Sequence, residues 1–478
     1  MNADVIRERY DAVPYRHGAV TDSHPARIGA IARLLGINSA PPDRCRVLEL
    51  GCGEGMNLLP LAERFPGSDF VGVDFSESQI AVAEAARGAC GIGNARFVCD
   101  DLRTWKHDGG TFDYVIAHGV YSWVPVEVRE RLFAICAEVL SPNGVAYVSY
   151  NTLPGWALPG GVRQFLLSET ARHDAPESQL THAACVLDAV AEAMKDQPGS
   201  YAANLRDTIA DMRQKAPGLL FHDELAEVNE PCTFVEFTDH ATRHGLHYLA
   251  EAHYATMQFE HVPAAMRAAL APLKLDFLRT QQFLDVLFQR WMRNSLLCRA
   301  PIAEARTIRA SVMADCALAL RMTVDVNSID LAPGQPMRFT GFHGLVLESR
   351  DPAEKAMLTV LASSYPTRLP FPAVCAMMNQ ALAESGLPST QDFSAMHDFL
   401  HRLFALDVLD VMLCGDGEWL KTSATPGPSA LMRHQAANDL PLTNRWHEPV
   451  GLTPEGRRAL DPAVRPDDTA LMRAGLLV

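Results

Sequence analysis

The alternation of strand and helix patterns between Cys45 and Asn151 constrains the fold of this chain more than any other feature. Short apolar runs rich in β-branched residues predict strands at residues 46–50, 69–75, 95–102, 112–118 and 145–151. Amphipathic stretches between them predict helices at residues 57–65, 76–91 and 126–140. Strands that alternate with helices form parallel sheets with crossover helices on both faces. We therefore expect a doubly wound α/β sheet.

The remaining segments predict further domains. Residues 1–44 read as an arm and a helix with Ser23 as its N-cap, followed by the core at 45–160. A helical insertion, which we expect to support dimerisation, covers 161–230, and residues 231–300 add two late strands to the same sheet, at 246–254 and 294–301. Three helices and two short strands around a Gly-Asp-Gly turn predict a winged-helix-like unit at 301–422, and the tail at 423–478 shows little regular pattern.

Composition excludes several classes of partner. Asp and Glu number 57 against 42 Lys and Arg, which gives a net charge of −15. A protein that grips phosphate backbones carries the opposite sign, so we expect no nucleic-acid partner, whereas basic proteins would be attracted. The eleven cysteines contain no C-x-x-C pair, and no apolar stretch is long enough for a membrane span. We expect a cytoplasmic protein with reduced cysteines and no membrane insertion.

The stretch VLELGCGEGMNLLPL predicts a ligand-binding turn between the first strand and its helix. Glu49 ends the strand, and glycines follow at 51, 53 and 55, which allows the backbone to approach a ligand closely. A dinucleotide fingerprint needs its third glycine at 56, where this chain has Met56. A carboxylate beside the turn would repel a pyrophosphate but suits the ammonium of S-adenosylmethionine (SAM). The turn therefore predicts SAM, with S-adenosylhomocysteine as product.

Two further acids follow later strands of the expected sheet. Asp74 closes the second strand, 23 residues after Gly51, where it can accept both ribose hydroxyls. Asp101 ends the third strand and can accept the adenine amino group, with Asp100 as the alternative if the register slips by one residue. Asp is also common in strand-end loops as an ordinary capping residue. Three acids at successive strand ends beside a glycine turn favour the cofactor site.

Together with these motifs, longer stretches resemble one family. They are YDAVPY, SHPARIGAIARLLG, the run from VLELGCGEGMNLLPL to DFSESQI, IAHGVYSWVP, VSYNTLPGW and EVNEPCTFVEFTDHATRHGLHYLAEA, with a weaker continuation in NRWHEPVGL. The chain thereby resembles class I SAM-dependent methyltransferases with a methyltransferase regulatory domain, and in particular the rickettsial protein lysine methyltransferases of outer-membrane proteins. The resemblance implies a Rossmann-like class I methyltransferase fold and a homodimer around an open cavity.

The resemblance also implies roles for individual residues. Glu49, Gly51, Gly53, Gly55 and Asn57 would form the methionine side of the site, with Asp74 at the ribose, Asp101 and Leu102 at the adenine, and His118 and Gly119 beside the reacting methyl. Tyr121 and Trp123 follow the fourth strand and can line a methyl or substrate pocket by cation–π attraction, or they can pack the next helix. Tyr10 and Tyr15 in the arm can close over the cofactor as a lid.

These observations predict a SAM-dependent methyltransferase that acts on lysine side chains of a protein or peptide. The alternatives are an N- or O-methyltransferase of small molecules or natural-product peptides, and a SAM-binding regulator without turnover. We expect the part after Pro301 to select the substrate, so that a fragment ending near Arg299 still binds SAM. His240, His244 and His247 share a helical face, but without a converging carboxylate–cysteine set we expect a polar interface and no metal.

Overall fold

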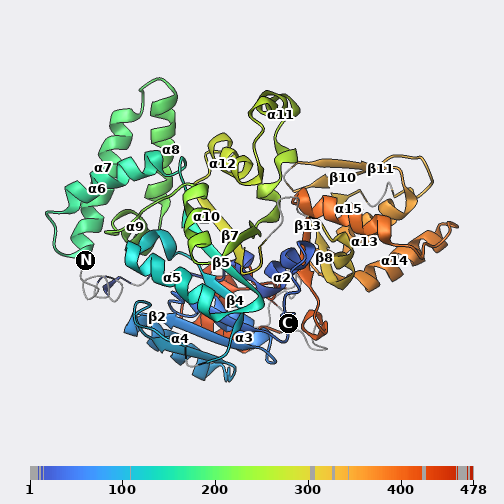
Figure 1. The fold of residues 1–478 in the computed structure, drawn as a ribbon, viewed down its shortest axis with the longest axis horizontal. Helices are drawn as coiled ribbons and strands as arrows, with labels where there is room; N and C mark the ends of the chain where they lie inside the picture. The colour runs from blue at the N-terminus through green and yellow to red at the C-terminus, as the bar shows by residue number, and fades with distance from the viewer. Residues whose placement is uncertain are drawn as a thin grey trace.

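A seven-stranded sheet organises the first 300 residues (Figure 1). The computed structural model describes residues 9–476 except 10, 11, 14, 108, 302–306, 326–328, 343, 422–426, 459, 461–470, 472 and 473. The strand order is β3-β2-β1-β4-β5-β7-β6. The strands are β1 Arg46–Leu50, β2 Asp69–Asp74, β3 Ala95–Cys99, β4 Phe112–Ala117, β5 Leu140–Asn151, β6 His247–Glu251 and β7 Met292–Cys298.

The two late strands join the sheet that the sequence predicts. Strands β1 to β5 pair in parallel, with Leu48 opposite Val71 on one side and Val115 on the other. Strand β7 runs antiparallel to both β5 and β6. The doubly wound α/β fold is therefore confirmed. The parallel strands bring their carboxyl ends, where ligands bind in such sheets, to one edge.

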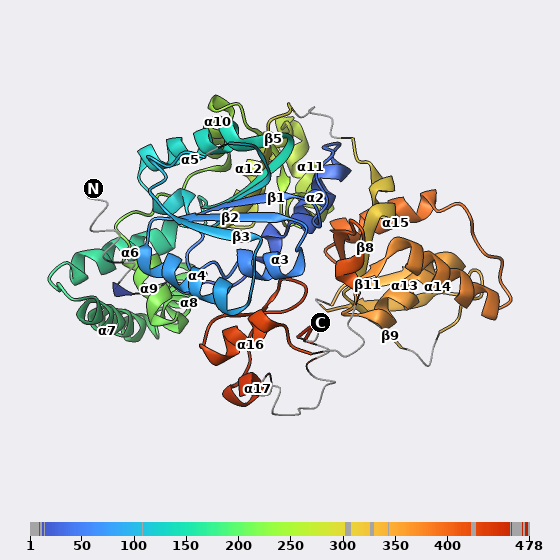
Figure 2. The same ribbon diagram turned by 90° about the horizontal axis from the view of Figure 1, so that it is seen from below.

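Helices cover both faces of this sheet (Figure 2). One face carries α2 Pro25–Leu34, α3 Leu58–Arg64 and α4 Glu77–Ala89; the other carries α5 Val126–Val139 and α10 Phe234–Arg243. Ser76 caps α4, since its side chain accepts the Gln79 N–H. The prediction of Ser23 as the cap of α2 is wrong, because His24 accepts the Ala26 N–H and Ser23 instead bonds to Asn57.

A helical bundle projects from one end of the sheet (Figure 1). It consists of α6 Ala157–Thr170, α7 Pro176–Met194, α8 Ser200–Gln214 and α9 Pro217–Glu224. Leu166, Leu187, Ile209 and Phe221 form a core of its own. The chain then returns through α10 and β6, followed by α11 Ala264–Leu270 and α12 Phe277–Leu287 on the way to β7.

The segment after residue 306 packs at the opposite end and differs from the expected winged helix. Its helices are α13 Pro352–Ser364, α14 Phe371–Glu384 and α15 Ser394–Ala405, and its strands are β8 Cys316–Leu320, β9 Met322–Val324, β10 Met337–Gly341, β11 Val346–Ser349, β12 Leu369–Pro370 and β13 Leu409–Leu413. The predicted ribbon of two strands is wrong. Strand β13 pairs with β8, and the second predicted strand is instead the 3₁₀ helix η8 Glu418–Leu420. Other 3₁₀ turns are η1 Thr21–Ser23, η2 Tyr121–Trp123, η3 Tyr254–Met257, η4 Phe259–His261, η5 Ala271–Leu273 and η6 Ala310–Asp315.

The tail holds more structure than its composition indicates. It contains α16 Ala430–Ala437, β14 Leu442–Thr443, β15 Pro449–Val450 and α17 Pro454–Arg458. Helix α16 starts against α3, where Glu63 accepts hydrogen bonds from the Ser429 hydroxyl at 2.6 Å and the Leu431 N–H at 2.9 Å. The tail thus packs against the helix that follows the glycine turn (Figure 2). Within the described residues, no helix is both long and apolar enough to cross a membrane.

Candidate active site

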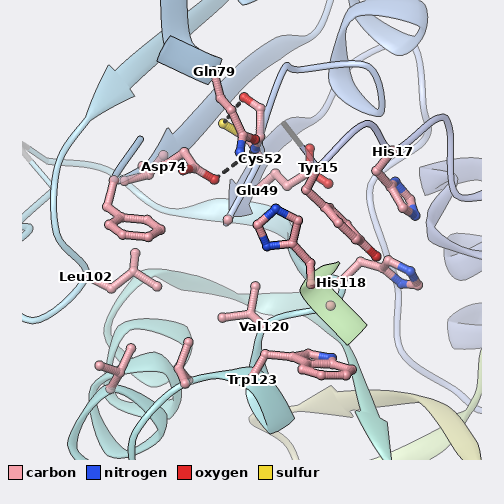
Figure 3. A pocket seen from close by; sticks show the side chains of 18 of the residues that line it. Tyr15, His17, Glu49, Cys52, Asp74, Gln79, Leu102, His118, Val120 and Trp123 are labelled. Atoms are coloured by element: carbon pink, nitrogen blue, oxygen red, sulfur yellow. Dashed lines mark hydrogen bonds between the residues drawn. The ribbon is translucent and has the colours of Figure 1, made fainter. Parts of the chain in front are cut away.

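A cleft opens at the carboxyl ends of β1, β2 and β4 (Figure 3). The sequence-predicted residues that line it are Tyr15, Glu49, Gly51, Gly53, Asn57, Asp74, Asp101, Leu102, His118, Gly119 and Trp123. The structure therefore brings together nearly all of the candidate residues, from five separate segments of the chain. Tyr10, the other predicted lid residue, lies outside the described residues.

The three glycines of the turn have different surroundings. Gly51 has φ +76°, and a Cβ there would lie 2.5 Å from the Val120 side chain, so any larger residue would push the two loops of the cleft apart. Gly53 has φ +52°, and its N–H donates to Asp74 Oδ2 at 2.9 Å. Gly55 does not line the cleft; it packs inward, where a Cβ would collide with Phe97. Gly51 and Gly53 thus border the cleft, and Gly55 serves helix packing.

Glu49 is a buried carboxyl group in which one oxygen has a hydrogen-bond partner and the other has none among the described residues. Its Oε1 accepts the Asn57 Nδ2–H at 2.7 Å. Its Oε2 is buried without a hydrogen-bond partner among the described residues. Burial raises the pKa of Glu49 to about 8. A buried carboxylate oxygen that faces a cleft without a partner is costly, and a bound ammonium group would satisfy it.

Asn57 connects this carboxylate to both ends of the chain. Its Oδ1 accepts hydrogen bonds from the Val20 N–H and from His447 Nε2, both at 2.8 Å. His447 is buried, which lowers its pKa to about 3 and keeps its ring neutral. Sequence reasoning missed His447, because 390 residues separate it from Asn57 and no local pattern marks the contact.

The two later acids differ in how they are held. Asp74 is buried and accepts the N–H groups of Gly53 and Ser76 with separate oxygens, both at 2.9 Å. Asp101 is half-buried at the rim, where it accepts from the Arg103 N–H at 2.9 Å. Among the described residues Asp101 lines the cleft and Asp100 does not, which favours Asp101 of the two alternatives.

The far wall of the cleft is built from aromatic and imidazole rings (Figure 3). Tyr15 and His17 from the arm lie beside His118, with the two imidazole centroids 5.0 Å apart. His118 Nδ1 lies 3.0 Å from the Tyr147 hydroxyl, and burial lowers the pKa of His118 to about 3. This wall therefore presents uncharged rings to the cleft, next to the exposed backbone of Gly119.

The structure places Trp123 at the cleft and Tyr121 in the core. Trp123 lines the cleft, with Trp156 edge-on at 5.9 Å. Tyr121 is buried in the core, and its hydroxyl lies 2.8 Å from His240 Nδ1. A direct role of Tyr121 in a methyl or substrate pocket is therefore wrong; the alternative, that it packs the following helix, agrees with its contact to Phe133 at 5.3 Å between ring centroids. The 3₁₀ geometry of η2 explains this, because with three residues per turn two residues that are two positions apart point in different directions.

Two residues from the helical bundle also line the cleft, and sequence reasoning missed both. His222 and Asp223 lie on α9, and the ring of His222 stands edge-on to Tyr15 with centroids 5.5 Å apart. Asp223 Oδ2 lies 2.8 Å from Lys215 Nζ. The sequence placed this bundle in a separate insertion, and only the fold shows that α9 reaches back to the sheet.

The residues present fit SAM. The unpartnered Glu49 oxygen suits the methionine ammonium, Asp74 stands at the end of β2 where a ribose binds in such folds, and Asp101 and Leu102 border the position for adenine. The pyrophosphate of a dinucleotide would face the Glu49 carboxylate instead. The donor and acceptor set therefore selects an adenosyl ligand with a cationic amino-acid end.

Comparison with known proteins agrees with this geometry. Residues 47–144 match the model of a family described as a methyltransferase domain, and residues 216–299 match one described as a predicted methyltransferase regulatory domain. Two uncharacterized proteins of Rickettsia prowazekii are similar. RP789 is 34% identical over 299 residues, covering 63% of this chain and 54% of RP789, and RP028 is 31% identical over 234 residues, covering 49% of this chain and 94% of RP028. This chain thus spans about half the length of RP789.

A solved structure is similar over almost the whole chain. The structure of PKMT2 from Rickettsia typhi in complex with AdoHcy (S-adenosylhomocysteine) is 26% identical with a TM-score of 0.80, and the match covers 94% of this chain and 88% of that one. A second structure of PKMT2 gives a TM-score of 0.79 at 25% identity. The family models and the solved structure with AdoHcy agree with the features of the cleft. The chain belongs to the class I SAM-dependent methyltransferases that carry a methyltransferase regulatory domain.

Proposed function

We propose that this enzyme transfers methyl groups to lysine side chains of a protein or peptide substrate. The observation that carries the proposal is the far wall of the cleft, where Tyr15, His17, His118, Trp123 and His222 present rings toward the cofactor side. An apolar, ring-lined wall suits a slender aliphatic side chain such as lysine. The resemblance to the rickettsial protein lysine methyltransferases and the fold match to PKMT2 support the same acceptor.

The cofactor side of the site is proposed residue by residue. Glu49 would hold the methionine ammonium, with Asn57 fixing its orientation through the 2.7 Å hydrogen bond. Asp74 would accept hydrogen bonds from the ribose hydroxyls in addition to the one from the Gly53 N–H. Asp101 and Leu102 would border the adenine. When bound, SAM supplies an electrophilic methyl group that the acceptor nitrogen takes by in-line displacement.

The chain's own residues prepare the acceptor. A lysine ammonium has no lone pair, so it must lose its proton before it can accept a methyl group. Burial lowers the pKa values of His17, His118 and His222, so these rings stay uncharged at neutral pH. A low-polarity wall of neutral rings disfavours the charged ammonium and lowers the pKa of a lysine that enters it. Alignment along the wall then supplies most of the rate.

Charge at the cleft favours a basic substrate. Acidic side chains outnumber Arg and Lys among the described residues that line the cleft. Arg103 is the basic one of these, and the acidic ones are Glu49, Glu54, Asp74, Asp101, Glu127 and Asp223. The whole chain carries a net charge of −15. Such a field concentrates positively charged segments at the mouth and speeds their encounter.

Assembly and compartment are further parts of the proposal. We expect a homodimer supported by the helical insertion, α6 to α9, where Phe165 and Tyr201 are exposed. Light scattering on the purified full chain checks this. We expect the enzyme to work in the cytoplasm, which fits its eleven free cysteines.

The acceptor is tested with the purified full chain and SAM labelled in the methyl group. Incubation with a dialysed lysate should place the label in protein, and mass spectrometry of digested bands should find it on lysine. An Asp74→Ala chain serves as the inactive control. A parallel incubation uses undialysed lysate, and label that enters only its small-molecule fraction would establish the alternative, a small-molecule methyltransferase. Label on protein carboxylates or other side chains would contradict the lysine assignment.

The ionisation of Glu49 gives a prediction for cofactor binding. Because burial raises its pKa to about 8, the carboxyl keeps its proton below that pH, whereas an ammonium needs the carboxylate. SAM should therefore bind more tightly as the pH rises from 6 to 7.5, with the affinity approaching a tenfold gain per pH unit at the lower end of this window, in which the α-amino group of SAM stays mostly protonated. Calorimetry on wild type and Glu49→Gln measures it: the variant should bind weakly with a flat pH profile. An equal slope in both proteins would remove Glu49 from this role.

The same ionisation predicts how the stability of the cofactor-free protein changes with pH. The folded chain holds a proton on Glu49 that the unfolded chain releases near pH 4.5, so this residue lowers the free energy of unfolding as the pH rises from 4.5 towards 8. Glu49→Gln should remove that decline and be the more stable protein at pH 8 in the absence of SAM. Denaturant unfolding at pH 5 and pH 8 separates this effect from a general loss of packing.

A further inference from the structure

A histidine–carboxylate cluster lies outside the cleft, between α5 and α10. Glu130 comes from α5, and His240 and His244 lie one turn apart at the end of α10. His240 Nε2 is 3.3 Å from Glu130 Oε1, and His244 Nε2 is 2.8 Å from Glu130 Oε2. One ligand atom from each of the three lies within 4.8 Å of the others. His247, which the sequence placed on the same helical face, begins β6 instead and is not part of the cluster.

His240 is held as a metal ligand would be. Its ring is 6% exposed, and in the described part of the chain its Nε2 is buried without a hydrogen bond. Its Nδ1 lies 2.8 Å from the Tyr121 hydroxyl. If Nδ1 carries the proton and donates to Tyr121, the Nε2 lone pair points at the cluster. Metal-bound histidines are oriented in this way by a partner on the second ring nitrogen.

The cluster is packed against an aromatic ring on one side and open to water on the other. Phe133 packs between the helices, with its ring centroid 4.7 Å from that of His240. Arg243 is the cation that also faces His240. Glu130 is 48% exposed, which leaves one side of the cluster open to water.

We propose that Glu130, His240 and His244 bind a divalent cation of the zinc class that joins α5 to α10. Zinc takes imidazole and carboxylate ligands at about 2.0–2.2 Å in tetrahedral geometry, which sets ligand atoms roughly 3.3 Å apart. His240 Nε2 and Glu130 Oε1 lie 3.3 Å apart, and the three ligand atoms lie within 4.8 Å of one another. A water would fill the fourth position on the exposed side. Through His240 the ion would fix Tyr121, the first residue of the η2 turn that carries Trp123 to the cleft.

The experiment uses the untagged full chain, freed of metal with a chelator, and Co²⁺ and Zn²⁺ as probes. Co²⁺ should give a visible absorption band of a four- or five-coordinate site, and Zn²⁺ should displace it at one equivalent. His244→Ala should weaken Zn²⁺ binding at least tenfold, and Glu130→Gln should also weaken it. His247→Ala is the matched control, because it removes a nearby histidine outside the cluster and should bind Zn²⁺ as wild type does.

Each outcome decides the proposal. Loss of the Co²⁺ band in His244→Ala but not in His247→Ala supports it, provided circular dichroism shows both variants folded. Absence of a saturable band in wild type, or a band that survives His244→Ala, overturns it and leaves the cluster as an ion pair between two helices. SAM affinity measured with and without Zn²⁺ then shows whether the ion acts on the cleft through Tyr121. The cofactor site can fail its own tests without affecting this one.

Discussion

A chain that ends at Arg299 is expected to lose its folded structure and, with it, SAM binding. The sequence led us to expect the opposite, because every predicted cofactor residue precedes Leu153. The structure shows that the C-terminal part completes the core of the catalytic domain. One continuous apolar cluster includes Ile31 of α2, Phe65 after α3 and Leu318, Val411 and Trp419 from beyond residue 306.

Buried charges strengthen this coupling. Arg27 of α2 forms an ion pair with Asp410 of β13, and Arg368 donates to the same carboxylate at 2.8 Å. Asp410 is 3% exposed, so removing it leaves Arg27 without its buried partner, at a cost of about 3–5 kcal/mol. The truncation would also remove His447 and with it the hydrogen bond to Asn57 Oδ1. Against a total stability of roughly 5–15 kcal/mol, these losses and the uncovered apolar surface exceed what the fragment retains.

Near-ultraviolet circular dichroism and SAM calorimetry on residues 1–299 measure the outcome. The control is co-expression with residues 300–478, which should restore soluble protein and recover both pieces together. Full-length Asp410→Asn gives a graded comparison, with lowered stability but retained fold. A soluble 1–299 fragment with a cooperative melt and wild-type SAM affinity would show that the two parts are independent.

The sequence predicted those features that neighbouring residues determine. Strand periodicity gave all seven strands of the sheet, including the late β6 and β7, because each buried strand carries its own apolar run. The glycine turn gave the position of Glu49 and Gly51, because a strand followed by spaced glycines specifies a turn at the strand's carboxyl end. The position of Asp74 followed from its place at the carboxyl end of β2.

The sequence could not predict features that depend on contacts between distant segments. The residues after the Gly-Asp-Gly turn read as a strand, but Trp419 packs against Phe65 at 5.4 Å between ring centroids and donates from Nε1 to Cys414 O at 2.7 Å. These contacts coil the chain into η8 instead. His222 reaches the cleft, and His447 reaches the cleft residue Asn57, from outside the sheet, so nothing in their own neighbourhood marks them.

Substitution of Asp74 is expected to produce the second large effect, a loss of SAM affinity of about a hundredfold in Asp74→Ala. A ribose held by this carboxylate would form charge-assisted hydrogen bonds worth roughly 1.5–3 kcal/mol each, and two of them at the lower end of this range correspond to about two orders of magnitude in Kd. The structure adds a second reason. Asp74 Oδ2 also accepts the Gly53 N–H at 2.9 Å, so removing the side chain releases the turn that borders the cleft.

Two further variants separate the contributions to this loss. Asp74→Asn keeps one oxygen for the Gly53 N–H but removes the charge and one acceptor, so it should lose less affinity than alanine while the turn stays in place. Asp69→Ala, at the exposed amino end of the same strand, is the matched control and should bind SAM as wild type does. Calorimetry measures the affinities, and thermal unfolding without SAM reports on the fold. If Asp74→Ala were to bind as tightly as Asp69→Ala, the ribose would lie elsewhere, and the carboxylate would serve only to hold the turn. A weak but equal affinity of the alanine and asparagine variants would instead assign the whole effect to the charge and the second acceptor oxygen, and none of it to the Gly53 hydrogen bond.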